Sequence, residues 1–380
     1  MSLIEKILNE NSHVHIHDDK RTYVEDTVRS LLNDGRKMLH VVADFDFTLT
    51  VYEKNGVILP STFGVIESNE QIKRKKKRTM SLIEKILNEN SHVHIHDDKR
   101  IYVEDTVRSL LNDGRKMLHV VADFDFTLTV YEKNGVILPS TFGVIESNAQ
   151  VKLPDGSLLA IKAEALRLKY HPIEIDVHMD VSEKIPYMIE WWRKAQNLFV
   201  LSNLTKSSIR EFVHQASMEL KKGVHEFITD LLHSETPILI FSAGLGDVIE
   251  FCLEKEIPDF KHNHESSHIV SNFINYDNDG KILSFSDKLI HSFNKNEHEI
   301  SDTPYFQTIL TRPNVILLGD SLGDVGMIGG MKNLKQILKI GYLNHSTPVK
   351  LEVYKNVYDI VVCDDQTFDV PNAILKAIPE

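Results

Sequence analysis

The chain has little cysteine, little tryptophan and no long hydrophobic run. Two cysteines, Cys252 and Cys363, among 380 residues are too few for a disulfide framework and are typical of a reducing compartment. No apolar stretch approaches the roughly 20 residues that a membrane-spanning helix needs, and the N-terminus lacks the apolar segment of a secretory signal peptide. We therefore predict a cytoplasmic protein with no membrane partner.

An excess of positive charge is also missing. The formal net charge is −12, which argues against broad binding to nucleic acid or to membrane surfaces. A small anionic substrate stays open, because a bound Mg²⁺ and a nearby lysine can invert the local field. The chain is 42% hydrophobic and 26% charged, an ordinary globular composition, and it is long enough for two domains.

The chain contains a duplicated N-terminal segment. Met1–Asn69 recurs as Met80–Asn148 at an offset of 79 residues, and Thr22 against Ile101 is the one difference. Two copies are too few for a solenoid, so the repeat indicates an exon duplication or an assembly artefact rather than a working array. The basic stretch 71–79 predicts a solvated linker, with a nuclear-import or nucleic-acid patch as the alternative. We expect residues 1–79 to be non-catalytic.

The periodicity predicts an α/β fold. Each copy reads as a helix, a short strand (HVHIH), a second helix and an apolar strand (LHVVADFDF). His92, His94 and His96 share one face of the short strand, but no matching cysteine or carboxylate set lies nearby, so a half-exposed strand is expected rather than a metal site. From Pro237 to the C-terminus apolar strands alternate with helices, which indicates a doubly wound, Rossmann-like parallel sheet.

The helix-rich stretch at 141–236 interrupts this alternation. We expect it to form a helical cap over the active-site mouth, with 80–140 and 237–380 forming the core. Within the core, strands are expected at 237–244, 268–276, 282–285, 314–320, 337–343 and 359–363. Helices are expected at 246–256, 303–312, 324–333, 347–356 and 372–379.

Four groups with chemical potential follow predicted strands. In chain order they are Asp123, Asp125 and Thr127 in DFDFT, Ser242 in FSAGLGD, Lys295 in SFNKNE, and Asp320 with Asp324 in GDSLGD. Functional groups of open parallel sheets collect at the carboxyl ends of the strands. Paired carboxylates suit a hard cation beside a carboxylate nucleophile, and the glycine-rich turn after Ser242 lets backbone N–H groups approach a phosphate. The four groups in this order indicate a phosphate-processing site with a bound cation much more specifically than any one of them does alone.

In this order the chain resembles the haloacid dehalogenase superfamily of phosphotransferases. More closely it resembles the cytosolic 5'-nucleotidase type III, or pyrimidine 5'-nucleotidase, family, through strings that include VVADFDFTLT, KYHPIEID, PYMIEWW, ILIFSAGLGDVIE, IVSNFINYDNDGKI and VILLGDSLGD. The resemblance runs from about Met80 to the C-terminus. It implies a phosphatase core with a cap and a nucleoside monophosphate as the small-molecule partner.

The resemblance also implies roles for the strand-end residues. Asp123 would attack phosphorus and form an aspartyl-phosphate, and Asp125 would protonate the leaving oxygen and then activate water. Mg²⁺ would be held by Asp123, the backbone carbonyl of Asp125 and Asp320, with Asp324 orienting this shell.

Further residues would bind the substrate. Ser242, the N–H of Ala243 and Lys295 would bind the phosphate oxygens. In the cap, Glu174 would contact the base, and Trp192 would stack on it by its position in the family string. An indole beside a carboxylate also suits a cationic base, so 7-methyl-GMP is expected to be hydrolysed beside CMP and UMP; cation–π attraction contributes roughly 1–2 kcal/mol when desolvated.

Two other functions remain open from sequence. One is a non-catalytic nucleotide-binding protein whose duplicated front end blocks the site, against which the intact acidic motifs weigh. The other is a phosphatase of the same superfamily that acts on another small phosphomonoester such as phosphoserine, against which Glu174 and Trp192 weigh.

Overall fold

The computed structural model describes residues 80–380 except 177, 296–302 and 332, together with residues 5, 9, 16, 20–34, 53–54 and 57–58. The chain divides into two units, Met1–Thr79 and Met80–Glu380, and each is described by itself. In the part described, no helix is long and apolar enough to span a bilayer.

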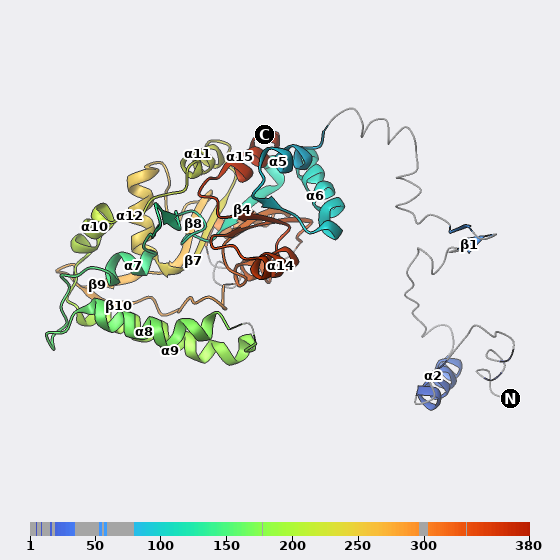
Figure 1. Cartoon of the computed structure of the whole chain (residues 1–380), viewed down its shortest axis with the longest axis horizontal. Helices are drawn as coiled ribbons and strands as arrows, with labels where there is room; N and C mark the ends of the chain where they lie inside the picture. The colour runs from blue at the N-terminus through green and yellow to red at the C-terminus, as the bar shows by residue number, and fades with distance from the viewer. Residues whose placement is uncertain are drawn as a thin grey trace. The chain divides into compact units, whose positions relative to one another are not determined.

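A seven-stranded sheet forms the centre of the second unit (Figure 1). Its spatial order is β3 (Val93–His94), β13 (Ile360–Cys363), β12 (Gln336–Leu343), β11 (Asn314–Gly319), β4 (Leu118–Ala122), β7 (Ile238–Leu245) and β8 (Ser267–Asn272). The edge strand β3 pairs antiparallel with β13, and the other neighbours pair parallel. The predicted α/β fold with a mostly parallel sheet is confirmed.

The strands β4, β7, β11 and β13 are mostly apolar because both faces of the sheet are covered. Successive residues of β4 belong to different cores: Val120 packs in one and Val121 in the other. The same alternation separates Leu318 from Leu317, as the two-residue period of a strand requires. The continuous apolar runs in the sequence therefore reflect a sheet buried between two layers.

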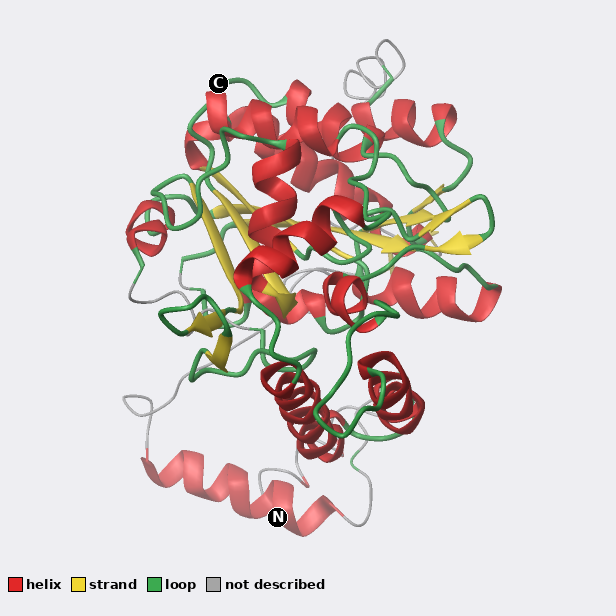
Figure 2. Ribbon diagram, turned by 90° about the vertical axis from the view of Figure 1, so that its left-hand side faces the viewer, coloured by secondary structure: helices red, strands yellow, loops and turns green. Residues whose placement is uncertain are grey.

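Helices supply these two layers, as Figure 2 shows on either side of the strands. The larger core is covered by α5 (Leu82–Glu89), α6 (Arg100–Asp113), α11 (Val224–His233), α12 (Gly246–Glu256) and α15 (Asp369–Ala377). The smaller core is covered by α13 (Pro304–Ile309) and α14 (Pro348–Val357).

The segment between β4 and β7 begins with a hairpin and is otherwise mostly helical. The hairpin pairs β5 (Glu132–Lys133) with β6 (Val136–Ile137) across Asn134 and Gly135, both at positive φ, the usual chemistry of a tight hairpin turn. After it come α7 (Thr141–Glu146), α8 (Leu159–Glu174), α9 (Val181–Leu201) and α10 (Lys206–Gln215). Helices α8 and α9 lie side by side (Figure 1), and α9 contacts β10 (Ile282–Phe285), the partner of β9 (Ile274–Tyr276). The cap boundaries at 141 and 236 stay a prediction.

Three expected elements differ from the structure. The strand predicted over HVHIH is only Val93–His94, because it is a short edge strand held on one side by β13. The strand predicted at 268–276 is broken at Phe273 into β8 and β9, which belong to different sheets. The helix predicted at 324–333 is a short 3₁₀ helix, Asp324–Ile328, because a glycine-rich stretch disfavours a longer α-helix.

The first unit repeats local elements of the second at the same offset. Its helix α2 (Arg21–Asp34) corresponds to α6, and its hairpin of β1 (Glu53–Lys54) and β2 (Val57–Ile58) corresponds to the hairpin of β5 and β6. Asp44 and Asp46, the counterparts of Asp123 and Asp125 in the first copy, and the basic stretch 71–79 fall outside the described residues.

Candidate active site

The first acidic motif lies directly beyond the carboxyl end of β4. The backbone N–H of Asp123 donates to Leu318 O at 2.9 Å, which ties the start of the loop to β11. The next turn is tight: Phe126 has a φ of 64° and its N–H donates to Thr129 Oγ1 at 2.7 Å. Thr127 Oγ1 donates to Asp123 Oδ2 at 3.2 Å. These bonds fix a buried carboxylate at the sheet edge.

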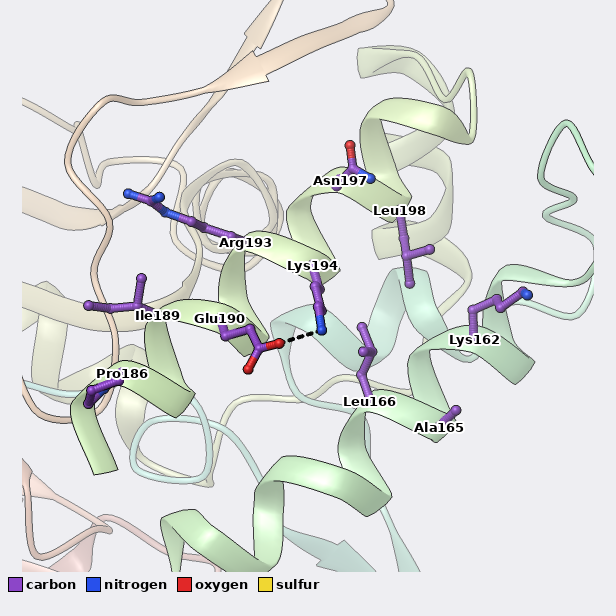
Figure 3. A pocket seen from close by; sticks show the side chains of 10 residues that line it. All are labelled: Lys162, Ala165, Leu166, Pro186, Ile189, Glu190, Arg193, Lys194, Asn197 and Leu198. Atoms are coloured by element: carbon purple, nitrogen blue, oxygen red, sulfur yellow. Dashed lines mark hydrogen bonds and ion pairs between the residues drawn. The ribbon is translucent and has the colours of Figure 1, made fainter. Parts of the chain in front are cut away.

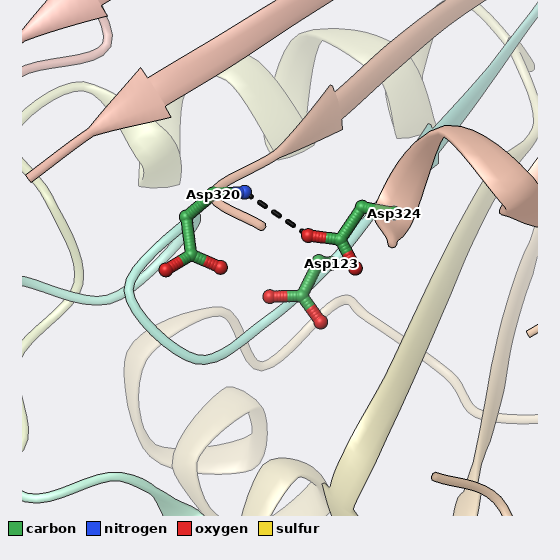
Figure 4. Close-up of side chains that lie close together, drawn as sticks. All are labelled: Asp123, Asp320 and Asp324. Carbon is green, nitrogen blue, oxygen red and sulfur yellow. Dashed lines mark hydrogen bonds between the residues drawn. The ribbon is translucent and has the colours of Figure 1, made fainter. Parts of the chain in front are cut away.

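The second acidic motif lies beside the first because β11 and β4 are neighbours in register, with Leu318 opposite Ala122. Ligand oxygens of Asp123, Asp320 and Asp324 lie within 4.8 Å of one another, and Figure 4 shows the three carboxylates converging. Asp324 Oδ2 accepts the N–H groups of Asp320 and Ser321 at 3.1 and 2.9 Å. Such oxygen-only ligand sets suit Mg²⁺.

Lys295 brings a positive charge into the same cluster. Its Nζ lies 2.5 Å from Asp123 Oδ1 and 2.8 Å from Asp324 Oδ1, and all three side chains are nearly inaccessible. Although burial lowers it, the pKa of Lys295 is held above its usual value by these two carboxylates. Burial raises the pKa of Asp123 to about 7, while the charge of Lys295 lowers it. The ammonium thus compensates two buried carboxylates.

Asp125 lies outside the three-carboxylate group and is held by α7. Its Oδ1 accepts the N–H of Thr141 at 2.8 Å and its Oδ2 accepts Thr141 Oγ1 at 2.7 Å. Burial raises the pKa of Asp125 to about 6, and the bonds from Thr141 oppose the rise. A carboxyl with that pKa can exist in both protonation states near neutrality, which acid–base catalysis requires. The carboxylate of Asp125 does not join the described three-carboxylate group; its backbone carbonyl remains the predicted ligand.

The carboxyl-terminal end of β7, where its pairing with β8 is irregular, closes another side of the site. Ser242 is buried, and its Oγ accepts the N–H of Gly244 at 3.0 Å. A Cβ on Gly244 would lie 2.1 Å from Thr141 Oγ1, 2.9 Å from Asp125 Oδ2 and 3.1 Å from Ser242 Oγ. Gly244 is therefore required for the close approach of this end of β7 to Asp125. Ala243 contributes its carbonyl to a bond from Trp192 Nε1 at 2.8 Å.

The two tryptophans have different surroundings. Trp191 stacks on the buried Tyr170 of α8, with ring centroids 5.9 Å apart. Trp192 bonds to Ala243 beside the core and meets the ring of His291 at 6.4 Å. Of the pair, Trp192 therefore lies next to the predicted phosphate-binding residues Ser242 and Ala243, and its stacking on the base stays a prediction.

Glu174, at the end of α8, also contacts the core. Its Oε1 accepts a hydrogen bond from Ser292 Oγ, three residues before Lys295. Burial raises the pKa of Glu174, and the bond from Ser292 together with the charges of nearby cations lowers it. Glu174, the predicted base-contacting residue, is thus hydrogen-bonded to the loop that carries Lys295, the predicted phosphate-binding residue.

Several residues of the site escaped the sequence prediction. Thr141 holds both oxygens of Asp125. Asn344 Nδ2 donates to Phe126 O at 3.0 Å, and the buried Lys221 donates to Asn344 Oδ1 at 3.0 Å. For Thr141 the available signal was Ser140 as a helix N-cap in PSTF. No local pattern pointed to Asn344 or Lys221.

A separate groove lies between α8 and α9. It has a volume of about 690 Å³, and its lining includes Leu166, Ile189 and the ion-paired Glu190 and Lys194 (Figure 3). None of the predicted site residues lines it. The groove is therefore distinct from the acidic cluster.

Comparison with known proteins identifies the family. Residues 126–379 match the family described as pyrimidine 5'-nucleotidase (UMPH-1). The chain belongs to the pyrimidine 5'-nucleotidase family. The resemblance stated from the motifs is confirmed, and so is the prediction of a hydrolase of the 5'-nucleotidase class.

Named relatives agree. The chain is 39% identical to the human 7-methylguanosine phosphate-specific 5'-nucleotidase over 276 residues, which are 73% of this chain and 89% of the relative. It is 37% identical to the protein of that name from Drosophila melanogaster, over 73% of this chain and 84% of the relative. A crystal structure of cytosolic 5'-nucleotidase IIIB bound to cytidine is similar with a TM-score of 0.66 and 34% identity, covering 76% of this chain and 93% of that one.

Proposed function

We propose that this chain is a Mg²⁺-dependent 5'-nucleotidase that converts nucleoside 5'-monophosphates to nucleoside and phosphate through an aspartyl-phosphate on Asp123. The observation that carries the proposal is the convergence of Asp123, Asp320 and Asp324 within 4.8 Å, with Lys295 between two of them. The alternative of a blocked, non-catalytic binding protein fits poorly with a complete and mutually bonded acidic set.

The donor set fits magnesium. The three side chains offer carboxylate oxygens, and soft ligands are absent from this cluster. We assign Asp123, Asp320 and the backbone carbonyl of Asp125 as ligands, with Asp324 fixing the loop through the N–H groups of Asp320 and Ser321. When bound, Mg²⁺ would neutralise charge on the phosphate, so that an anionic nucleophile can approach it.

The reaction then has two half-reactions. In the first, an oxygen of Asp123 bonds to phosphorus, the bond from phosphorus to the 5'-oxygen breaks, and Asp125 gives its proton to that oxygen. In the second, Asp125 takes a proton from water, the water oxygen bonds to phosphorus, and the acyl-phosphate bond breaks to restore Asp123. Ser242, the Ala243 N–H and Lys295 bind the phosphate oxygens in both.

For the substrate we propose pyrimidine monophosphates and 7-methyl-GMP. The support is the name of the relatives, 7-methylguanosine phosphate-specific 5'-nucleotidase, and the cytidine bound by the structural neighbour. Glu174 can accept from an amino group of the base, and Trp192 lies beside Ala243. The name "cytosolic" of the structural neighbour also supports a cytoplasmic location for this chain.

The test is phosphate release from a panel of CMP, UMP, 7-methyl-GMP, GMP and phosphoserine, with and without Mg²⁺. We expect Asp123→Asn to abolish turnover, because the amide keeps the shape and removes the nucleophile; Asp44→Asn is included so that the first copy cannot substitute. Asp125→Asn should slow both half-reactions. Full turnover by the Asp123→Asn, Asp44→Asn chain would overturn the mechanism.

A further inference from the structure

Two contacts from different elements converge on Glu174. Ser292 Oγ donates to its carboxylate oxygen Oε1, and Lys184 Nζ donates to its backbone carbonyl at 2.9 Å. The first contact joins the end of α8 to the loop that carries Lys295, and the second joins it to the first turns of α9. Among the described residues, no donor is bonded to the second carboxylate oxygen, Oε2.

The loop that carries Ser292 is itself tightly held. Asn272, at the end of β8, donates to Ile290 O at 2.8 Å and accepts the N–H of Ile290 at 3.0 Å. The N–H of His291 donates to Asn294 Oδ1 at 2.7 Å. Hydrogen bonds therefore hold the loop that carries Ser292 in place, and the bond from the Ser292 hydroxyl can fix the rotamer of Glu174.

Lys184 fixes the backbone of Glu174. Its side chain is buried, and its ammonium lies 5.5 Å from the centre of the Phe293 ring, in the same core loop. A cation is favourable here because the last carbonyls of α8 carry the negative end of the helix dipole. Lys184 thus holds the end of α8 against both α9 and the loop of Ser292.

We propose that Ser292 and Lys184 are positioning residues for base selection: together they hold Glu174 as a fixed acceptor, so that the site prefers cytosine to uracil. This inference rests on the proposed nucleotidase function. An ionised carboxylate accepts hydrogen bonds and cannot donate them. Cytosine presents an amino donor at position 4 where uracil presents an acceptor oxygen, so an immobilised Glu174 favours CMP and opposes UMP.

The hydroxyl of Ser292 also keeps Glu174 in its accepting form. Burial raises the pKa of Glu174, whereas the bond from Ser292 lowers it. Without that bond the carboxyl is free to rotate and is protonated more readily, and a protonated carboxyl can donate to the uracil oxygen. Both changes reduce the discrimination between the two bases.

The test measures kcat and KM for CMP and UMP in the full chain and in Ser292→Ala, Ser292→Thr and Lys184→Met. We expect the parent to prefer CMP in kcat/KM. Ser292→Ala should reduce the CMP/UMP ratio roughly tenfold, the scale of one hydrogen bond to a charged group, mainly through KM for CMP. Ser292→Thr should restore it, and Lys184→Met should reduce it. Ser284→Ala, an exposed serine on β10, and Lys162→Met, an exposed lysine on α8, are the matched controls.

A double-mutant cycle separates positioning from a general structural effect. In a Glu174→Gln background, Ser292→Ala should no longer change the CMP/UMP ratio, because the carboxylate that it positions is gone. An unchanged ratio in both Ser292→Ala and Lys184→Met, or an equal loss in the Glu174→Gln background, would overturn the inference.

Binding of cytidine and uridine, measured by calorimetry, gives a second readout that needs no catalysis. If the parent chain hydrolyses no nucleoside monophosphate, the proposed function fails. The positioning inference would still stand if Ser292→Ala reduced the cytidine/uridine affinity ratio, and it would fail if that ratio did not change.

Discussion

Replacing Thr141 by valine should separate the two half-reactions. The Thr141 hydroxyl is fully buried, donates to Asp125 Oδ2 at 2.7 Å and accepts the N–H of Leu245 at 3.1 Å. Valine keeps the shape and loses both bonds, while the backbone N–H at 141 can still bond to Oδ1. A hydrogen bond to a charged group contributes about 1.5–3 kcal/mol, which corresponds to about one to two pKa units.

The direction of the effect on each half-reaction follows from the protonation state of Asp125 that the half-reaction needs. The first half-reaction needs protonated Asp125, and the second needs the carboxylate. The pKa of Asp125 is about 6 in the parent, and loss of a bond to the charged form raises it further. At pH 7 the carboxylate fraction should therefore fall about two- to tenfold. The water step should slow accordingly, whereas the proton-donating step is not impaired, so the aspartyl-phosphate should accumulate.

The assay combines a pH profile of kcat for CMP with rapid acid quenching to measure the phosphoenzyme. We expect Thr141→Val to shift the acidic limb of the profile upward by about one to two units and to raise the phosphoenzyme fraction. Thr141→Ser keeps the hydroxyl and should behave like the parent. The unpaired N–H of Leu245 should cost about 1–3 kcal/mol of unfolding free energy, which a melting curve checks. An unchanged pH limb with no phosphoenzyme in Thr141→Val would show that Asp125 is not the proton carrier.

Three further predictions test the site, its specificity and the duplication. Gly244→Ala should lower kcat at least about tenfold, because its Cβ would collide with Thr141 Oγ1 and force this end of β7 away from Asp125; Gly326→Ala, whose Cβ meets only a carbonyl at 3.5 Å, is the control. 7-Methyl-GMP should be hydrolysed well and GMP poorly, because a cationic base gains roughly 1–2 kcal/mol over a desolvated indole; equal kcat/KM for the two would contradict a role for Trp192. A chain that begins at Met80 should keep parent activity and melting behaviour, and a folded but inactive truncation would show that the first copy takes part in catalysis.

The fold and the acidic cluster were predictable from the chain because both depend on short-range patterns. Apolar runs of strand length that alternate with amphipathic helices indicate a parallel sheet. The carboxyl ends of neighbouring parallel strands lie level, so motifs that follow β4 and β11 must meet, as the pairing of Leu318 with Ala122 shows. The sequence therefore predicted that Asp123 and Asp320 lie at the same edge of the sheet, whereas the adjacency of β4 and β11 is seen only in the structure.

Residues on loops and on the cap were predictable only in part. Thr141 follows Asp125 by a hairpin and a turn, and nothing in that spacing says that the chain returns to the same carboxylate. The contact of Ser292 with Glu174 joins residues that are 118 positions apart. The stretch 324–333 was predicted to be one helix, but it holds only the 3₁₀ helix Asp324–Ile328, because its glycines disfavour the longer α-helix that hydrophobic periodicity indicates.

The duplication, finally, is constrained by the place of β4 in the sheet. Leu118–Ala122 lies between β7 and β11 and pairs with both, so that place holds one strand and one Asp123. The one position where the copies differ does not decide which strand occupies it, because Ile101 is 49% exposed on α6. What distinguishes the second copy is the chain that follows it. Beyond Asn148 it continues directly into α8 and α9, whereas Thr141, which holds Asp125, lies within the repeat and has Thr62 as its counterpart in the first copy. The first copy leads instead into the stretch before Met80, and loop closure over the longer path costs about 0.6 kcal/mol more per doubling of length. The chain has one set of the downstream residues Ser242, Lys295, Asp320 and Asp324, and this set can serve one acidic pair. Asp44 and Asp46 should therefore be catalytically idle in a molecule in which Asp123 and Asp125 occupy the site.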